Sequence, residues 1–150
     1  MVGVFLLAGS TARADVSSAW KHYKGKIIVS DTEIKANYDT DKDMIAGLKK
    51  AHKATLVRPA GSDTWAIYFI GFMSKKPGSS KVSLVFYEAG KHAYVSAKEI
   101  TIDPGSNIVM ADVEVSEDDG LKKGGRYDVV LGRKVGGKET VFARTKLTFK

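Results

Sequence analysis

Apolar and polar residues alternate with a period of two along most of the chain, which is typical of β-strands that bury one face. In residues 108–115 the alternate positions from Val109 to Val115 are all apolar, whereas Asp112 and Glu114 occupy the opposite face. The same alternation, with turn residues between the segments, predicts strands at residues 26–30, 54–58, 64–73, 81–87, 92–102, 108–115, 126–132 and 140–149. Residues 31–38 show no clear pattern, and residues 92–102 fit one strand or two.

Two of these segments allow a more specific prediction. Residues 64–73 are apolar on both faces, which favours a central strand that is covered on both sides. For the last strand, the alternation predicts that Val141, Ala143, Leu147 and Phe149 face the core, while Phe142, Arg144, Lys146 and Lys150 face outward.

One segment, residues 40–52, has the pattern of a helix instead. Thr40 is a typical N-cap that can accept a hydrogen bond from the backbone N–H of Asp43, whose carboxylate can reach back in a capping box. Met44, Ile45 and Leu48 form a single apolar stripe. Basic residues follow in the last turn, where they suit the negative end of the helix dipole.

Seven to eight short strands predict an all-β protein, an antiparallel β-sandwich with one short inserted helix at about residues 40–52. The length of 150 residues suits one domain, which we place at residues 15–150.

Residues 121–131, LKKGGRYDVVL, resemble the approach to the penultimate strand of immunoglobulin-like and fibronectin type III domains. In that family a Leu and a Gly precede a Tyr, here Tyr127, whose hydroxyl ties the corner to the backbone. Trp65, on the long apolar strand, is similar to the core tryptophan of such sandwiches. The chain departs from the family because it has no cysteine pair and because a helix interrupts the early strands. The resemblance implies an immunoglobulin-like sandwich but no active site, since these folds carry unrelated functions.

The first residues have the pattern of a signal peptide, predicted at residues 1–14. Residues 2–9, VGVFLLAG, form a short apolar run, and Ala12 and Ala14 are the small residues of an A-x-A cleavage site. We therefore expect cleavage after Ala14 and export of the mature chain to the periplasm or the extracellular space. No Lys or Arg precedes the apolar run, so the alternative is a cytosolic protein whose first strand spans residues 2–7. The absence of cysteine excludes disulfides, thiolate zinc sites and a cysteine nucleophile.

Two segments that resemble known binding loops fail at the residues that matter. Residues 39–43, DTDKD, begin like a calcium loop, but Met44 stands at the glycine position and Lys50 at the bidentate glutamate position. Residues 132–139 match a phosphate-binding loop until its last position, where Glu139 replaces the Ser or Thr that holds magnesium. We interpret the first segment as a capped helix start and the second as a glycine-rich hairpin turn.

The remaining polar residues give no catalytic or metal constellation. His22, His52 and His92 lie far apart in sequence, and no pair has the spacing of metal ligands. No Ser occupies a nucleophile elbow. Trp20 and Tyr23, which flank His22, could form an exposed aromatic contact, but packing against the edge of a sheet is the expected role of large aromatic side chains. We therefore predict no catalytic residue, no metal and no cofactor.

The net charge of +7 is concentrated at the C-terminal end of the chain. Residues 121–150 hold nine basic groups and only two acidic ones, and residues 1–120 are balanced. One interpretation is that these cations prevent aggregation at an edge hairpin. The other is a docking surface for an anionic lipid, acidic glycan or acidic protein. Its candidate residues are Arg133, Lys134, Lys138, Arg144 and Lys146.

These observations predict an exported, non-catalytic module with a binding or structural role in the cell envelope or outside the cell. The first alternative is the basic docking module, and the second is an enzyme whose site is assembled from distant strands. A third is a subunit that pairs through an exposed strand at residues 140–149. We expect no transmembrane segment and no nucleic-acid partner, because no apolar run approaches ~20 residues and no aromatic-interleaved basic stripe is present. The oligomeric state stays open.

Overall fold

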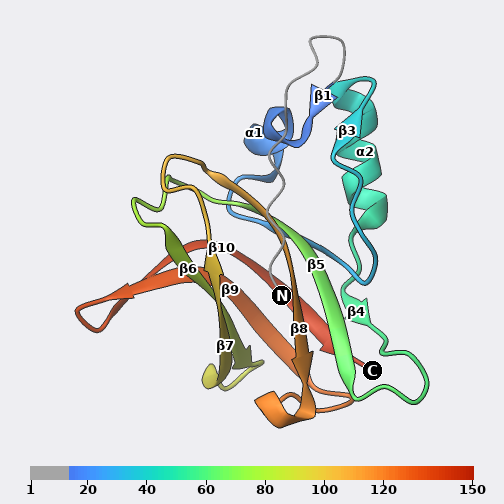
Figure 1. Ribbon diagram of the computed structural model, residues 1–150, viewed down its shortest axis with the longest axis vertical. Coiled ribbons are helices and arrows are strands. Elements are labelled where there is room, and N and C mark those ends of the chain that lie inside the picture. Colours follow the sequence, from blue (N-terminus) through green and yellow to red (C-terminus); the bar gives the residue numbers. More distant parts are fainter. Residues whose placement is uncertain (1–13) are drawn as a thin grey trace.

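The computed structural model describes residues 14–150, which form two β-sheets packed face to face and a small helical layer (Figure 1). The five-stranded sheet has the order β4-β10-β9-β6-β7, and the three-stranded sheet has the order β2-β5-β8. This arrangement confirms an all-β protein built from two sheets with a short inserted helix. The predicted signal peptide lies outside the described residues except for Ala14.

The elements follow the predicted order closely. The strands of the two large sheets are β2 (Ile27–Ser30), β4 (Thr55–Leu56), β5 (Thr64–Phe72), β6 (Lys81–Glu88), β7 (Ala93–Thr101), β8 (Ile108–Ser116), β9 (Arg126–Val135) and β10 (Lys138–Phe149). The helices are α1 (Trp20–Tyr23) and α2 (Asp41–Ala51), with 3₁₀ turns at Val16–Ala19 and Glu117–Asp119. The end of the segment 31–38, which showed no clear pattern, forms β3 (Asn37–Tyr38) and pairs with β1 (Ala14–Asp15) in a two-stranded ribbon.

The long strand β5 is covered on both faces, as predicted. One face carries Trp65, Ile67 and Phe69 into the core between the two sheets. The opposite face carries Ile70 and Phe72 into a second core under the helical layer. β5 is the middle strand of its sheet, between β2 and β8. Because both of its faces are apolar, it packs on the five-stranded sheet on one side and on the helical layer on the other.

Gly71 lets the two sheets approach closely at this strand. A Cβ atom at position 71 would lie 2.5 Å from Cδ2 of Leu131 and 2.9 Å from Cγ1 of Val109. Such contacts are shorter than packed side chains tolerate, so any larger residue at position 71 would force the side chains of Leu131 and Val109 to move.

Helix α2 begins at the predicted N-cap, but within residues 14–150 Asp43 does not form the return bond that would complete a capping box. The hydroxyl of Thr40 accepts a hydrogen bond from the backbone N–H of Asp43 at 3.1 Å. Met44 and Leu48 are fully buried against the outer face of the three-stranded sheet. Tyr23 is buried in the same cluster, and the Nε1–H of Trp20 donates to the carbonyl of Met73 at 2.7 Å. The N-terminal aromatic residues therefore pack on the sheet, as expected.

Strand β10 differs from the predicted pattern at its centre. Phe142 was predicted to face outward, but it is buried in the core between the sheets with 2% of its surface exposed. Val141, predicted to face inward, packs against the outer face of the five-stranded sheet. A register shift between Val141 and Ala143 explains both errors, because a bulge reverses the alternation that a simple period of two assumes.

The β9–β10 hairpin is longer than predicted and closes in a two-residue turn. Gly136 and Gly137 both have positive φ angles, 59° and 82°, which a tight hairpin turn requires and glycine adopts without strain. The segment that resembled a phosphate-binding loop is therefore a hairpin turn, and it projects away from the sandwich in Figure 1.

One strand pair departs from the antiparallel prediction. Strand β4, which follows α2, joins the edge of the five-stranded sheet parallel to β10.

The two residues that carried the family resemblance occupy structural positions. The hydroxyl of Tyr127 accepts a hydrogen bond from the backbone N–H of Lys122 at 2.8 Å, which ties the corner before β9. Trp65 is buried, and its Nε1–H donates to the carbonyl of Lys150 at 3.0 Å. The guanidinium carbon of Arg58 lies 4.7 Å from the centre of the Trp65 ring.

Candidate anion-binding cleft

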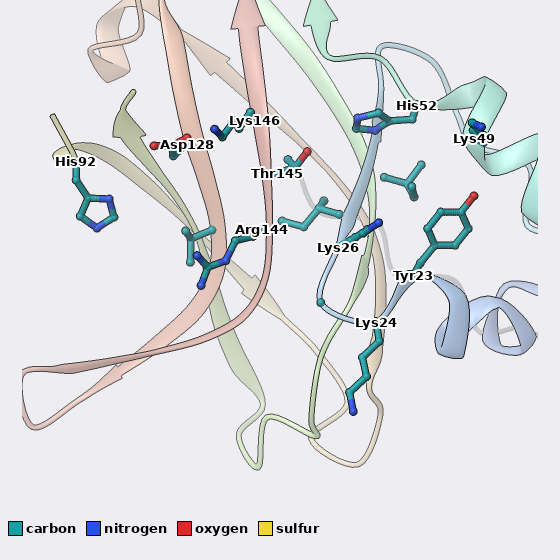
Figure 2. Close-up of a pocket in the computed structure, with 14 residues that line it drawn as sticks. Tyr23, Lys24, Lys26, Lys49, His52, His92, Asp128, Arg144, Thr145 and Lys146 are labelled. Carbon is teal, nitrogen blue, oxygen red and sulfur yellow. The ribbon is translucent and has the colours of Figure 1, made fainter. Parts of the chain in front are cut away.

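The two sheets meet at one side of the sandwich, where the start of β2 runs beside β10. Lys26 and Arg144 form a parallel bridge, and the N–H of Arg144 donates to the carbonyl of Gly25 at 3.1 Å. A cleft of about 790 Å³ opens beside this bridge (Figure 2). It is lined by residues from five separate parts of the chain: 23–28, the end of α2, His92, β9 and β10.

Positive side chains dominate this cleft. Lysines and an arginine enter it from β2, α2 and β10, and the only carboxylate in its lining is that of Asp128. Within residues 14–150 none of the five cations forms an ion pair. The five are Lys24, Lys26, Lys49, Arg144 and Lys146. We call this region the basic cleft.

Strand geometry explains why the β10 cations point the same way. Arg144 and Lys146 are two residues apart, so their side chains lie on the same face of the strand. That face is the outer face of the five-stranded sheet, and Lys146 lies directly across from Asp128 of β9. Figure 2 shows Lys26 and Arg144 on the two strands that meet at the cleft.

Lys24 differs from the other four cations. Its ammonium group lies 5.1 Å from the centre of the Trp20 ring, a cation–π contact. In Figure 2 its side chain extends away from the remaining lysines. Lys24 therefore belongs to the rim of the basic cleft.

His52 ends helix α2 and contributes a neutral hydrogen-bond donor. Its Nδ1 accepts the backbone N–H of Val29 at 3.0 Å, which leaves the proton of the neutral ring on Nε2. Burial lowers the pKa of the His52 imidazole below its ordinary value, so the ring is uncharged at neutral pH. The sequence placed His52 among the basic groups at the negative end of the helix dipole, a role that the neutral ring does not fulfil. The bond to Val29 was not predictable because its partner, the backbone of β2, is distant in the chain.

Tyr23 forms part of the wall and has a structural role. Its hydroxyl donates to the carbonyl of Ile45 at 2.7 Å, and burial raises the pKa of this phenol. This bond joins α1 to α2 and fixes the side of the cleft that carries Lys49.

His92 lies at the opposite end of the cleft and is held by stacking. Its ring lies 4.2 Å from the ring of Tyr87, with an interplanar angle of 10°. Asp128 also lines the cleft, but in the described part of the chain neither His52 nor His92 hydrogen-bonds a carboxylate. Residues 14–150 also contain no group of three or more His, Asp or Glu side chains that could hold a metal ion.

A second hollow of about 330 Å³ lies on the outer face of the same sheet. It is lined by Tyr94, Arg133, Lys134 and Glu139, with Ser83 and Val85 of β6 at its floor. The carboxylate of Glu139 accepts a hydrogen bond from the hydroxyl of Tyr87. Burial and this contact raise the pKa of Tyr87 to about 12.

The structure separates the five predicted docking residues into different places. Arg144 and Lys146 line the basic cleft, and Arg133 and Lys134 line the second hollow. Lys138 is exposed at the hairpin end and lines neither.

Sequence reasoning missed Lys26, Lys49 and His52 as site residues. The lysine at the end of α2 was accounted for by the helix dipole, and Lys26 by the start of a strand. The sequence shows basic residues just before β2 and at the end of α2. It does not show that these two positions lie beside β10 in space.

A possible membrane span and the likeness to known proteins also bear on function. In residues 14–150 no helix is long and apolar enough to cross a membrane. No protein-family model, curated protein or solved structure matches this chain, so the interpretation of the cleft depends on its own geometry.

Proposed function

We propose that this protein is an exported, non-catalytic module that binds an anionic ligand in the basic cleft. The observation that carries the proposal is that four cations without an ion pair among residues 14–150 line one cleft, namely Lys26, Lys49, Arg144 and Lys146, with Lys24 at its rim. Like charges on one exposed surface repel one another modestly, and a bound anion would relieve this repulsion and be attracted by several of the cations together.

The shape and donor set of the cleft support a ligand of moderate size. A volume of about 790 Å³ lies in the range of small-molecule binding sites. The neutral Nε2–H of His52 adds a hydrogen-bond donor beside the charges. In residues 14–150 neither histidine of the cleft hydrogen-bonds a carboxylate that would orient it as a general base, which supports binding over acid–base chemistry.

The proposal includes a fold family and a location. We infer an immunoglobulin-like type of sandwich from the corner at Tyr127 and the core residue Trp65, which match the family pattern described above. Export is inferred from the apolar run and the cleavage pattern ending at Ala14. Mass spectrometry of the protein from its native host tests export: a chain that begins at Asp15 supports it, and an intact Met1 contradicts it.

Elution from a heparin column tests anion binding and locates it. We expect the double variant Lys26→Glu/Arg144→Glu to elute at much lower salt than the unmodified protein, because charge reversal removes the attraction. The control, Lys42→Glu/Lys123→Glu, has the same change in net charge at exposed positions outside the cleft.

A third variant distinguishes the cleft from the hairpin end. Lys134→Glu/Lys138→Glu should weaken retention less than Lys26→Glu/Arg144→Glu does if the basic cleft holds the charged groups of the ligand. Equal elution of all three double variants would mean that only net charge matters and would contradict the proposal. The strongest loss in Lys134→Glu/Lys138→Glu would move the site to the hairpin.

A further inference from the structure

The outer face of the five-stranded sheet connects the basic cleft to the second hollow. Val130 of β9 lines the cleft, Val85 of β6 lines the second hollow, and both belong to one apolar cluster with Tyr87. The two cavities therefore lie along a single surface of the sheet.

A row of aromatic rings also links the basic cleft to the second hollow. His92, in the lining of the basic cleft, stacks on Tyr87, and Tyr87 meets Tyr94 edge to face with ring centres 6.4 Å apart. Tyr94 lines the second hollow and is one of the most exposed large side chains, with 63% of its surface accessible.

A bulge places Tyr94 on this face. Phe86 pairs with Ser96 and Tyr87 pairs with Tyr94, so Val95 is an extra residue on β7. If Val95 paired regularly instead, it would lie opposite Tyr87, and Tyr94 would move one position along β7 to the other face of the sheet. Bulges that redirect side chains in this way are frequent beside binding sites.

The second hollow mixes hydrogen-bond donors and acceptors beside an exposed ring. Lys134 supplies an ammonium donor, Glu139 a carboxylate acceptor and Ser83 a hydroxyl, whereas the guanidinium of Arg133 donates to the carbonyl of Pro77 at 3.2 Å. A sugar ring matches this set, since its hydroxyls both donate and accept and its C–H face packs on an aromatic ring.

We propose that this face binds a linear acidic glycan, with its charged groups in the basic cleft and a neighbouring sugar ring against Tyr94. This inference rests on the proposed anion binding and names the ligand class. The carboxylates of Asp128 and Glu139, one in each cavity, argue against a nucleic acid, because they repel a phosphodiester backbone that has no donor to offer them. An anionic lipid surface is disfavoured because the exposed large apolar residues of 14–150, namely Val57, Tyr94 and Val135, belong to separate elements.

Calorimetric titration with uronic-acid oligomers tests the proposal. We expect a hexamer to bind about tenfold more tightly than the dimer of the same sugar, since the longer chain can contact both cavities at once. Tyr94→Ala should remove that advantage and leave dimer binding unchanged, whereas Tyr94→Phe, which keeps the ring, should retain it. Val57→Ala is the matched control, because it truncates an equally exposed apolar side chain that lines neither cavity.

The outcomes separate this inference from the proposed function. Equal affinity for hexamer and dimer, together with loss of both in Lys26→Glu/Arg144→Glu, would overturn the extended glycan site and leave anion binding intact. No effect of Lys26→Glu/Arg144→Glu on any oligomer would overturn both proposals. Tighter, Tyr94-dependent binding of oligothymidylate, or of vesicles containing phosphatidylglycerol, would replace the glycan by that ligand class.

Discussion

Lys26 and Arg144 lie beside each other in a parallel bridge that joins the two sheets, although they come from opposite ends of the described chain. Their side chains line the same cleft, and neither is neutralised by a carboxylate of residues 14–150. Two neighbouring cations without a carboxylate partner repel each other, which lowers the free energy of unfolding. Such a cost is expected where function requires the charges.

The first prediction concerns that cost. Lys26→Gln should leave the unliganded protein as stable as before or more stable by up to about 0.5 kcal/mol at low salt, because one repelling charge is removed. Denaturant unfolding at low and high salt measures this, with Lys123→Gln as the control for an exposed lysine outside the cleft. A clear loss of stability that is specific to Lys26→Gln would show that the lysine stabilises the fold.

The second prediction concerns the corner before β9. Tyr127→Phe should destabilise the protein by about 1–2 kcal/mol, because the backbone N–H of Lys122 loses its acceptor. Thermal unfolding measures the change. Tyr94→Phe, which removes a hydroxyl from an exposed ring, should have almost no effect on the melting temperature. Equal melting temperatures for Tyr127→Phe and the unmodified protein would contradict a structural role for the hydroxyl.

The third prediction concerns the core. Trp65→Ala should cost roughly 3–5 kcal/mol, because the indole is buried between the sheets and packs on Phe149 with ring centres 5.1 Å apart. Trp65→Phe should cost less, because it keeps an aromatic ring in the core. Its remaining cost comes from the smaller ring and from the lost hydrogen bond to the carbonyl of Lys150. If unfolding in denaturant gave the same stability for Trp65→Ala as for the unmodified chain, the assignment of this strand to the core would be wrong.

The fourth prediction concerns acid. The folded state holds the pKa of His52 below its ordinary value of about 6.5, so the unfolded chain takes up the proton first as the pH falls. The stability contributed by neutral His52 is therefore present above pH ~6.5 and is lost as the pH falls toward the folded-state pKa. Protonation also converts Nδ1 into a donor, which breaks the bond from the Val29 N–H.

Melting temperatures measured between neutral pH and pH ~5 test this prediction. His52→Asn keeps an acceptor for Val29 but does not titrate, so its stability should fall less over this range. His22→Asn is the matched control at an exposed position and should behave like the unmodified protein. Parallel curves for all three proteins would show that His52 does not contribute to the acid sensitivity.

The sequence predicted the layers well because the relevant signals are local. Alternation from Val109 to Val115 gave the buried face of β8, and the doubly apolar segment around Phe69 gave the central strand. Alternation failed at Phe142, because it carries no sign of a bulge. The extra residue depends on how β10 pairs with β9, which is a tertiary property.

The binding surface was only partly predictable for a related reason. Arg144 and Lys146 were identified because basic residues accumulate along the C-terminal hairpin. Lys26, Lys49 and His52 join them only through the meeting of β2 with β10 and the packing of α2. No local pattern specifies those contacts, so the cleft could be recognised only in three dimensions.

The most direct test of the account is a nuclear magnetic resonance titration of isotope-labelled protein with an acidic oligosaccharide, in which the shift of each backbone amide is followed. The account predicts that the largest shifts occur at residues 24–28, 49–52 and 144–146, which line the basic cleft, with smaller shifts around Tyr94. Shifts confined to residues 133–138 at the hairpin end, or no shifts at saturating oligosaccharide, would contradict it.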